Sequence, residues 1–141
     1  MSWIQKQSVL IPLDFDELCY GAIAPAREFV EAESSLMLIH VLTPLHPADP
    51  AAMWNTLDNQ QRKDKVKDFL AKKLGEMGYQ DVKIDVEIGD PSTEIIDYAK
   101  TNGVDLIVMP SHGRKGVSRF LLGSVTERVV RLAPCPVLVL K

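Results

Sequence analysis

A glycine-rich segment with several cationic side chains lies near the end of this 141-residue chain. It reads MPSHGRKGVSRFLLGSVTE, from Met109 to Glu127, between an apolar run and a helical pattern. Glycine lets a backbone approach an anion closely because it has no Cβ, and a helix start presents free N–H groups to negative charge. The segment therefore suits a phosphate chain, and a mobile connector is the alternative interpretation.

Two well-known phosphate motifs are absent from it. Neither G-x-x-x-x-G-K-[ST] nor G-x-G-x-x-G occurs, so both of those phosphate sites are excluded. The segment also opens with Pro110, whose φ is fixed and which has no N–H to donate. A loop that grips phosphate would more naturally begin with glycine.

Hydrolytic and metal chemistry find little support in the sequence. Ser111 and His112 are adjacent, which rarely makes a working nucleophile and base, and no G-x-S-x-G turn surrounds them. His40 lies in an apolar run and is expected to be a core histidine with its polar atoms satisfied. The three histidines and two cysteines show no metal-ligand spacing. We therefore predict no catalytic residue and no metal site.

Short apolar runs alternate with helical patterns along the chain. Four runs are typical of strands buried on both faces. A fifth, over residues 82–88, alternates apolar and polar side chains, as in an edge strand with one wet face. Helical patterns separate the strands. The four buried strands are predicted at 9–13, 36–42, 105–109 and 136–140, and the helices at 18–33, 51–77, 91–102 and 124–132.

Two helices carry a clear apolar stripe, and one carries clear end signals. Asp90 is placed to cap the third helix, with Pro91 at its first position and Gly103 at its end. Gly78 is a plausible stop for the second helix. The stripe of the second helix is Val66, Phe69, Leu70, Leu74 and Met77, and that of the fourth is Val125, Val129 and Leu132.

The order of elements, βαβαβαβαβ, predicts one α/β domain over residues 1–141. Its core is an open, five-stranded parallel sheet with helices on both faces. In such sheets ligands bind beyond the carboxyl ends of the strands, where the strand order reverses. Residues 12–16, after the first strand, and the glycine-rich segment, after the fourth, are the candidates for that crevice.

Composition narrows the class of protein. A net charge of −3 argues against a nucleic-acid binder, whose surface is basic. No apolar stretch is long enough to span a bilayer, and no secretory signal is visible at the start. Cys19 and Cys135 lie far apart, which is typical of free thiols in a reducing compartment. We expect a cytoplasmic protein with a buried, unreactive Cys135.

Several stretches resemble one known family. SHGRKG, LLGSVTE and APCPVLVL are similar to the C-terminal signature of the universal stress proteins, and IPLDF and LIHV resemble their first two strands. Members that bind ATP carry G-x2-G-x9-G-[ST]. On this chain its later elements fall on Gly113, Gly123 and Ser124, and its first glycine falls on Pro110. The resemblance implies a Rossmann-like fold of the adenine nucleotide alpha hydrolase type, with strand order 3-2-1-4-5.

The resemblance also implies a nucleotide site. Asp14 would contact the ribose, the backbone of Val41 the adenine edge, and Gly113 would allow close approach to the phosphates. The alternative for Ser124 is an N-cap, because Ser124-x-x-Glu127 is also a capping box. Asp14 could instead cap the turn after the first strand. The full expected site is Pro12, Leu13, Asp14, Val41, Met109, Pro110, Ser111, His112, Gly113, Arg114, Gly123, Ser124, Val125 and Thr126.

Two functions remain open. The first is a stress or signalling module that binds ATP, AMP or ADP, with Mg²⁺ as an accompanying ion, and acts through conformation or an unknown protein partner. The second is a nucleotide-independent dimeric adaptor or scaffold. An enzyme is not expected beyond slow ATP hydrolysis, since no base can be named. The apolar outer strand Val137–Leu140 predicts a homodimer, because pairing two copies would cover an exposed edge.

Overall fold

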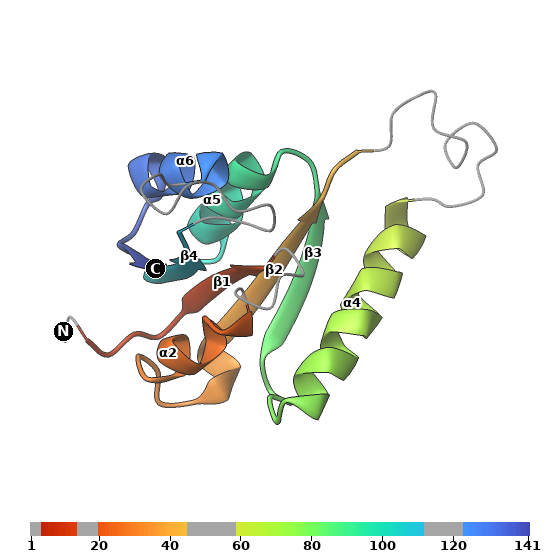
Figure 1. Cartoon of the computed structure of the whole chain (residues 1–141), viewed down its shortest axis with the longest axis horizontal. Coiled ribbons are helices and arrows are strands. Elements are labelled where there is room, and N and C mark those ends of the chain that lie inside the picture. The colour runs from red at the N-terminus through yellow and green to blue at the C-terminus, as the bar shows by residue number, and fades with distance from the viewer. Residues whose placement is uncertain (1–3, 14–19, 45–58, 112–122) are drawn as a thin grey trace.

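The protein forms one five-stranded parallel sheet in the order β3-β2-β1-β4-β5, which confirms the predicted fold (Figure 1). The computed structural model describes residues 4–13, 20–44, 59–111 and 123–141. Both ends of every strand lie within one residue of their predicted positions. The strands are β1 (Val9–Leu13), β2 (Leu36–Leu42), β3 (Lys83–Ile88), β4 (Leu106–Pro110) and β5 (Val137–Leu140).

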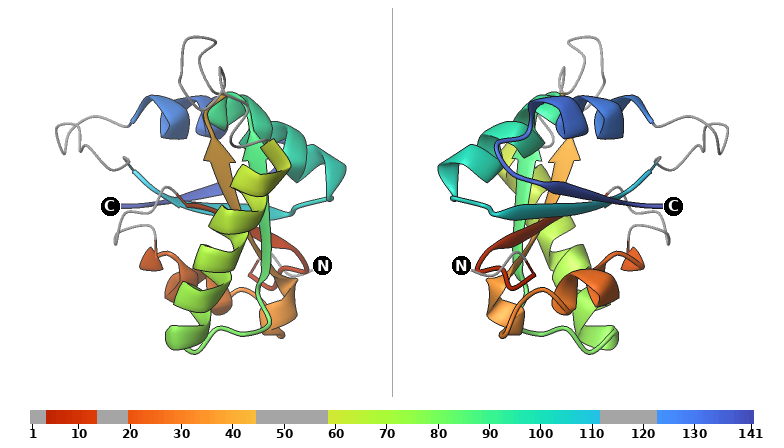
Figure 2. Two further views of the ribbon diagram at one scale, coloured as in Figure 1. Left: turned by 90° about the vertical axis from the view of Figure 1, so that its right-hand side faces the viewer. Right: turned by 90° about the vertical axis from the view of Figure 1, so that its left-hand side faces the viewer.

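Helices cover both faces of the sheet (Figure 2). On one face, α2 (Ile23–Arg27) and α4 (Asn59–Glu76) pack against the strands, and on the other α5 (Pro91–Thr101) and α6 (Ser124–Leu132) do so. A short 3-10 turn, η1 (Glu33–Ser35), precedes β2. The domain is therefore a three-layer arrangement of helices, sheet and helices.

The central strand contributes to both layers of the core. Val9, Ile11 and Leu13 of β1 face α2 and α4, whereas Leu10 faces α5 and α6. Successive side chains of a strand point to opposite faces, so a strand with helices on both sides must be apolar throughout. Burial of each such side chain contributes about 1.5–3 kcal/mol. This explains why the apolar runs were reliable signals of strands.

The first helix was predicted too long. Within the described residues the helical pattern at 18–33 is interrupted: Tyr20 is helical, residues 21–22 form a turn, and the five-residue α2 and then η1 follow. Pro25 is the reason, because a proline in a helix interior removes a hydrogen bond and clashes with the preceding turn. In α2 it stands within the first turn, where that bond is not needed.

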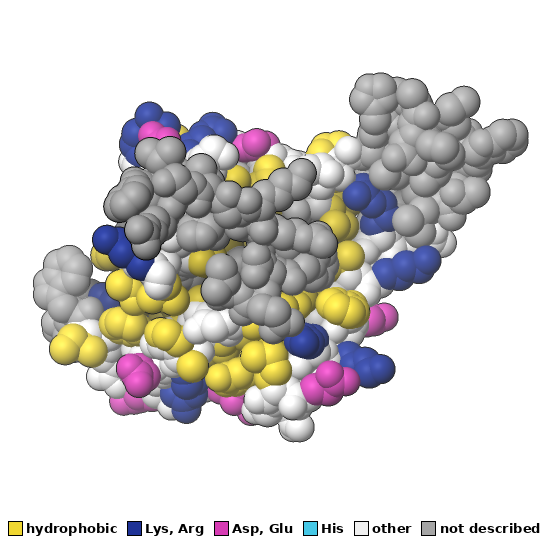
Figure 3. Space-filling model, viewed as in Figure 1, with side chains coloured by type: hydrophobic (Ala, Val, Ile, Leu, Met, Phe, Trp, Pro, Cys, Tyr) yellow, Lys and Arg dark blue, Asp and Glu magenta, His cyan; other side chains and the backbone are white. Residues whose placement is uncertain are grey.

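Three predicted stripe residues are exposed instead of buried. Leu70 and Leu74 of α4 reach the core, but Phe69 is 57% exposed and Met77 is 41% exposed. On α6, Val129 is buried while Leu132 is 49% exposed. The helical positions that face the sheet lie three or four residues apart, and a neighbour in sequence is turned about 100° away. On the face shown in Figure 3, Lys, Arg, Asp and Glu side chains surround a group of hydrophobic side chains.

The predicted helix ends are confirmed for α4 and α5. The Asp90 side chain accepts a bond from Thr93 N at 3.1 Å, as a cap does. Gly103 follows α5 with φ +62°, and Gly78 follows α4 with φ +90°. Both glycines adopt a conformation that other residues rarely take, which ends a helix.

Candidate functional site

The two central strands separate toward their carboxyl ends. β1 and β4 are paired only at Val9–Leu106 and Leu10–Ile107, whereas β1 is paired with β2 as far as Leu13. Pro12 and Pro110 stand in the unpaired parts, and neither has an N–H to donate to a neighbouring strand. The strand order also reverses at this point, and open sheets bind ligands beyond the strand ends at such a reversal.

Three hydrogen bonds hold the end of β4, one of them to β5 and two to the start of α6. Ser111 N donates to Leu140 O at 2.8 Å, and Gly123 N donates to Ser111 O at 2.8 Å. The Thr126 hydroxyl donates to Pro110 O at 3.0 Å. The chain thus leaves the sheet at Ser111 and returns beside it at Gly123. This arrangement fixes the beginning of α6 at the carboxyl end of β4.

The first turn of α6 carries backbone donors without acceptors. Gly123 is the N-cap, with φ −62° and ψ 153°, and no side chain caps the helix. The first bond inside the helix runs from Glu127 N to Gly123 O at 2.9 Å. None of the described residues accepts a bond from the N–H groups of Ser124, Val125 or Thr126. With the helix dipole behind them, such groups attract anions.

The capping-box interpretation of Ser124 is wrong. Ser124 is the first helical residue, and the cap position belongs to Gly123 because its backbone is extended. The Ser124 side chain is exposed and makes no cap bond. Its hydroxyl is therefore available to a ligand at the start of the helix.

Pro110 ends β4 and is not the first residue of the loop. Ile107 N donates to Pro136 O and Ser111 N to Leu140 O, so these residues face β5. Backbone groups alternate between the two neighbouring strands, so position 110 faces β1 and the crevice. The proline thus removes a donor on the side where the central strands separate.

His40 lies in β2, on the other side of β1 from β4. Its Nδ1 lies 2.6 Å from Leu13 O, and the ring is buried in β2. This contact joins the ends of β1 and β2, which confirms the expectation of a satisfied core histidine. Leu13, Met109 and Ser111 are also buried, and Val41 is half-buried.

The structure gathers the described part of the expected site at one edge. The ends of β1, β2 and β4 and the start of α6 carry ten of its residues, all at the carboxyl side of the sheet. The other four, Asp14, His112, Gly113 and Arg114, lie outside the described residues. Those ten are Pro12, Leu13, Val41, Met109, Pro110, Ser111, Gly123, Ser124, Val125 and Thr126.

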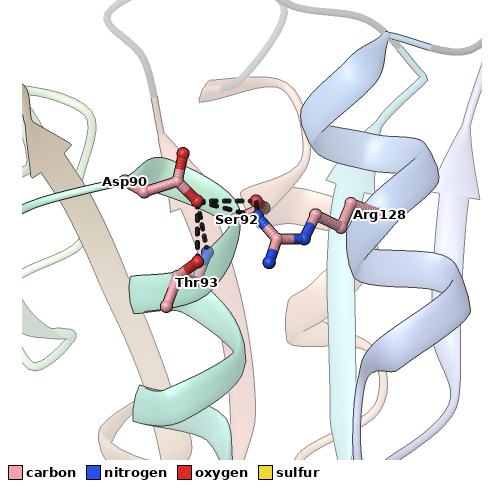
Figure 4. A network of polar contacts seen from close by, with 4 residues as sticks. All are labelled: Asp90, Ser92, Thr93 and Arg128. Atoms are coloured by element: carbon pink, nitrogen blue, oxygen red, sulfur yellow. Dashed lines mark hydrogen bonds and ion pairs between the residues drawn. The ribbon is translucent and has the colours of Figure 1, made fainter.

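One polar cluster near this edge was not foreseen. Asp90 Oδ2 accepts bonds from the Ser92 and Thr93 hydroxyls and from Arg128 Nη1, across the starts of α5 and α6 (Figure 4). The hydrogen bonds from Thr93, then Ser92, and the charge of Arg128 hold the pKa of Asp90 below its usual value. Sequence identified Asp90 as a cap, but no local pattern marks Arg128 as its partner.

The surroundings of Glu94 and Cys135 raise the pKa of each. Burial and the nearby carboxylates of Glu87, Asp97 and Asp90 raise the pKa of Glu94. Cys135 is half-buried, so the prediction of a buried side chain is wrong, although its partial burial raises the pKa of the thiol. Across 4–13, 20–44, 59–111 and 123–141 no three His, Cys, Asp or Glu residues gather as metal ligands. Nor does any helix in these ranges have the length and apolarity to cross a membrane.

Comparison with known proteins gives a consistent result. Residues 6–141 match the model of the Universal stress protein family. Universal stress protein MJ0531 of Methanocaldococcus jannaschii is 35% identical over 96% of this chain and 82% of its own length. The structure of MJ0577, from the same organism, is 30% identical, with a TM-score of 0.77 over 98% of this chain and 97% of that one.

Two more distant structures contain nucleotides. An Arabidopsis thaliana protein of the same family, solved with AMP bound, is 21% identical with a TM-score of 0.60, over 96% of this chain and 91% of that one. A universal stress protein in complex with cAMP is 19% identical with a TM-score of 0.64, over 96% and 97%. At these identities the likeness establishes a shared fold.

Proposed function

Because the chain belongs to the universal stress protein family, we propose that it binds an adenine nucleotide where β1 and β4 separate. The observation that carries this proposal is the first turn of α6. Hydrogen bonds fix it at the end of β4, and its N–H groups have no acceptor among the described residues. A phosphate group would supply the missing acceptors. The AMP and cAMP complexes of proteins with this fold support an adenine nucleotide as the ligand.

The remaining contacts are assigned by position. The phosphates would bind the N–H groups of Ser124, Val125 and Thr126 and the Ser124 hydroxyl. Gly113, Arg114 and His112 would approach them from the loop. The adenine edge would meet the backbone of Val41, and Asp14 the ribose. Mg²⁺ would accompany ATP, which with ADP and AMP is the proposed ligand.

Gly123 provides the direct test. Its φ and ψ are accessible to any residue, so valine there does not strain the backbone. Gly123 is buried and is the N-cap, so a valine side chain there would add bulk next to the first-turn N–H groups that we propose bind phosphate. We expect Gly123→Val to abolish the heat of ATP–Mg²⁺ binding in calorimetry.

Gly75→Val is the matched control, because a Cβ at Gly75 of α4 meets nothing within 4 Å. It should leave ATP affinity unchanged. Wild-type affinity in folded Gly123→Val would contradict the proposed site. If no adenine nucleotide binds the wild type, the chain is instead the nucleotide-independent dimeric adaptor or scaffold.

We further propose that the nucleotide acts by changing conformation or partner binding in a stress response in the cytoplasm. The described residues offer the phosphate region N–H groups and hydroxyls, and no base positioned for hydrolysis there. Catalysis beyond slow ATP hydrolysis is therefore not part of the proposal. The partner would be another protein that distinguishes the occupied from the empty state.

A homodimer through β5 completes the proposed function. All four residues of β5 are half-buried, and Val130 and Leu132 of the adjacent α6 are exposed apolar side chains. An apolar edge strand with free backbone groups favours pairing with a second copy about a two-fold axis. This surface favours self-association whether or not nucleotide is bound.

Val139 tests the dimer without disturbing the sheet. The carbonyls of Pro136 and Leu140 face β4, so by alternation the N–H of Val139 faces the outer edge. Val139→Pro removes an edge donor while the bonds between β4 and β5 remain. We expect a dimer for the wild type and a monomer for Val139→Pro by light scattering at tens of micromolar. A dimer that survives this change would refute pairing through β5.

A further inference from the structure

One side chain of α6 links the starts of two helices. Arg128 stands four residues after Ser124, and its Nη1 donates to Asp90 Oδ2 at 3.1 Å and to Ser92 Oγ at 3.0 Å (Figure 4). Both acceptors belong to the first turn of α5, which Asp90 caps. The side chain extends from α6 toward α5, and its described partners all lie on α5.

Both linked helices pack into the same core layer, and α6 has further polar contacts at its start. α5 is fixed in the core by Ile95, Ile96 and Ala99, which are almost completely buried. The start of α6 is bound to the end of β4 by one backbone bond, from Gly123 to Ser111, and by the Thr126 hydroxyl, and Val125 and Val129 pack into the core. Arg128 provides a tie to α5, about 3–6 Å along the helix from the N–H groups of Thr126, Val125 and Ser124. Among the described polar contacts, this tie is the one that links α6 directly to the start of α5, in addition to the apolar packing between the two helices.

We propose that Arg128 is a positioning residue that aims the first-turn N–H groups of α6 at the ligand phosphates. It would do so through Asp90 and Ser92, without touching the phosphates. The inference rests on the proposed nucleotide site. It adds a residue that affects phosphate binding from outside the loop and the strand ends.

Asp90→Asn separates positioning from simple charge effects. Asparagine is as good an N-cap as aspartate, so the cap of α5 is kept while the ion pair is lost. If only charge mattered, removing a carboxylate near a phosphate site would strengthen ATP binding. If Arg128 contacted phosphate directly, releasing it from Asp90 would also strengthen binding. If Arg128 positions the helix start, Asp90→Asn should instead weaken ATP binding.

We expect Asp90→Asn and Arg128→Met each to raise the calorimetric Kd for ATP by about threefold at low salt. This is the effect of an exposed ion pair, and salt should reduce it. Arg128→Lys should recover most of the affinity, because both bonds come from a single nitrogen that an ammonium group can replace. Arg131→Met, on the last turn of the same helix, is the control and should leave the Kd for ATP unchanged.

The double variant and adenosine sharpen the test. Asp90→Asn combined with Arg128→Met should weaken ATP binding no more than either change alone, because both remove one interaction. Adenosine has no phosphate, so its affinity should be the same in all variants. Tighter ATP binding by Asp90→Asn, additive losses, or equal losses for adenosine would each overturn the inference.

Hydrogen exchange of the ligand-free protein tests the positioning step on its own. Arg128→Met should speed exchange of the Glu127 amide, whose bond to Gly123 closes the first turn, and Arg131→Met should not. Unchanged exchange in Arg128→Met would overturn the inference even if ATP binds. If the wild type binds no nucleotide, the proposed function fails, and faster exchange would still support Arg128 as the residue that holds the helix start.

Discussion

Replacing Pro110 by glycine should tighten nucleotide binding and weaken the fold at the same time. Position 110 is the last of β4, and its N–H would face the gap between β1 and β4. The Pro110 carbonyl is already occupied by the Thr126 hydroxyl, so the substitution adds a donor and need not remove an acceptor. Glycine also removes the ring from the space that a ribose or a phosphate would cross.

The expected sizes follow from these changes. A hydrogen bond to a charged group contributes about 1.5–3 kcal/mol, which corresponds to a tenfold to hundredfold lower Kd for ATP. Loss of the proline makes the unfolded chain more flexible, which should cost on the order of 1 kcal/mol of folding free energy. For a domain of this size, that lowers the Tm by about 4 °C. Affinity and stability should therefore move in opposite directions.

Calorimetry with ATP and Mg²⁺ and thermal unfolding without ligand measure the two effects. Pro110→Ala restores the N–H but adds a Cβ, so its affinity should lie between those of the wild type and Pro110→Gly. Pro136→Gly, at the amino end of β5, is the control: it should lower the Tm without changing the Kd. If both variants at position 110 fold and bind ATP as the wild type does, the missing donor does not limit binding.

Three other outcomes are expected. Leu74→Ala should lower the free energy of unfolding by about 2–5 kcal/mol in urea titrations, while Met77→Ala, at an exposed position, should change it by less than about 1 kcal/mol; equal losses would contradict the assignment of the core face. Cys135 should react with a thiol reagent more slowly than in the unfolded chain, because burial raises its pKa and leaves little thiolate at neutral pH; rapid labelling would refute this. The native pKa of Asp90 lies below the usual 3.8, so its hydrogen bonds stabilise the fold above that pH and are lost as the pH falls through the native pKa. Asp90→Asn should therefore flatten this part of the acid unfolding curve. An unchanged curve would contradict the prediction.

The fold was predictable because the sheet is covered on both faces. Strands such as β1 and β2 must then be apolar throughout, and a run of that kind is visible without any tertiary information. The helices were harder to predict. Whether Phe69 or Leu132 is buried depends on the width of the surface that each helix covers, which no local pattern records. A proline inside a helical pattern, here Pro25, was the one local signal that could have shortened the first helix.

The position of the candidate site could be proposed from the sequence, and its polar contacts could not. The glycine-rich segment and the rule for open sheets predict a ligand site at the ends of β1 and β4. The link between Arg128 and Asp90 joins residues 38 apart in the chain, and it depends on the packing of α5 beside α6. The sequence also could not show that β1 and β4 separate. A proline in a strand removes a backbone donor, but the sequence does not indicate which neighbouring strand loses that hydrogen bond.

The strand β4 ends one residue later than predicted, and this changes the effect expected of Pro110. A strand predicted over 105–109 leaves Pro110 as the first loop residue. The direction of its backbone groups is then not determined by strand pairing. The observed strand pairs Pro110 with Leu140, and the bonds of Ile107 and Ser111 to β5 then determine its direction. Since directions alternate along a strand, a shift by one residue would turn the missing N–H toward β5. A donor missing there would weaken the sheet and leave the ligand unaffected. Because it faces β1 instead, Pro110 should act on nucleotide affinity, and the variants at this position measure that directly.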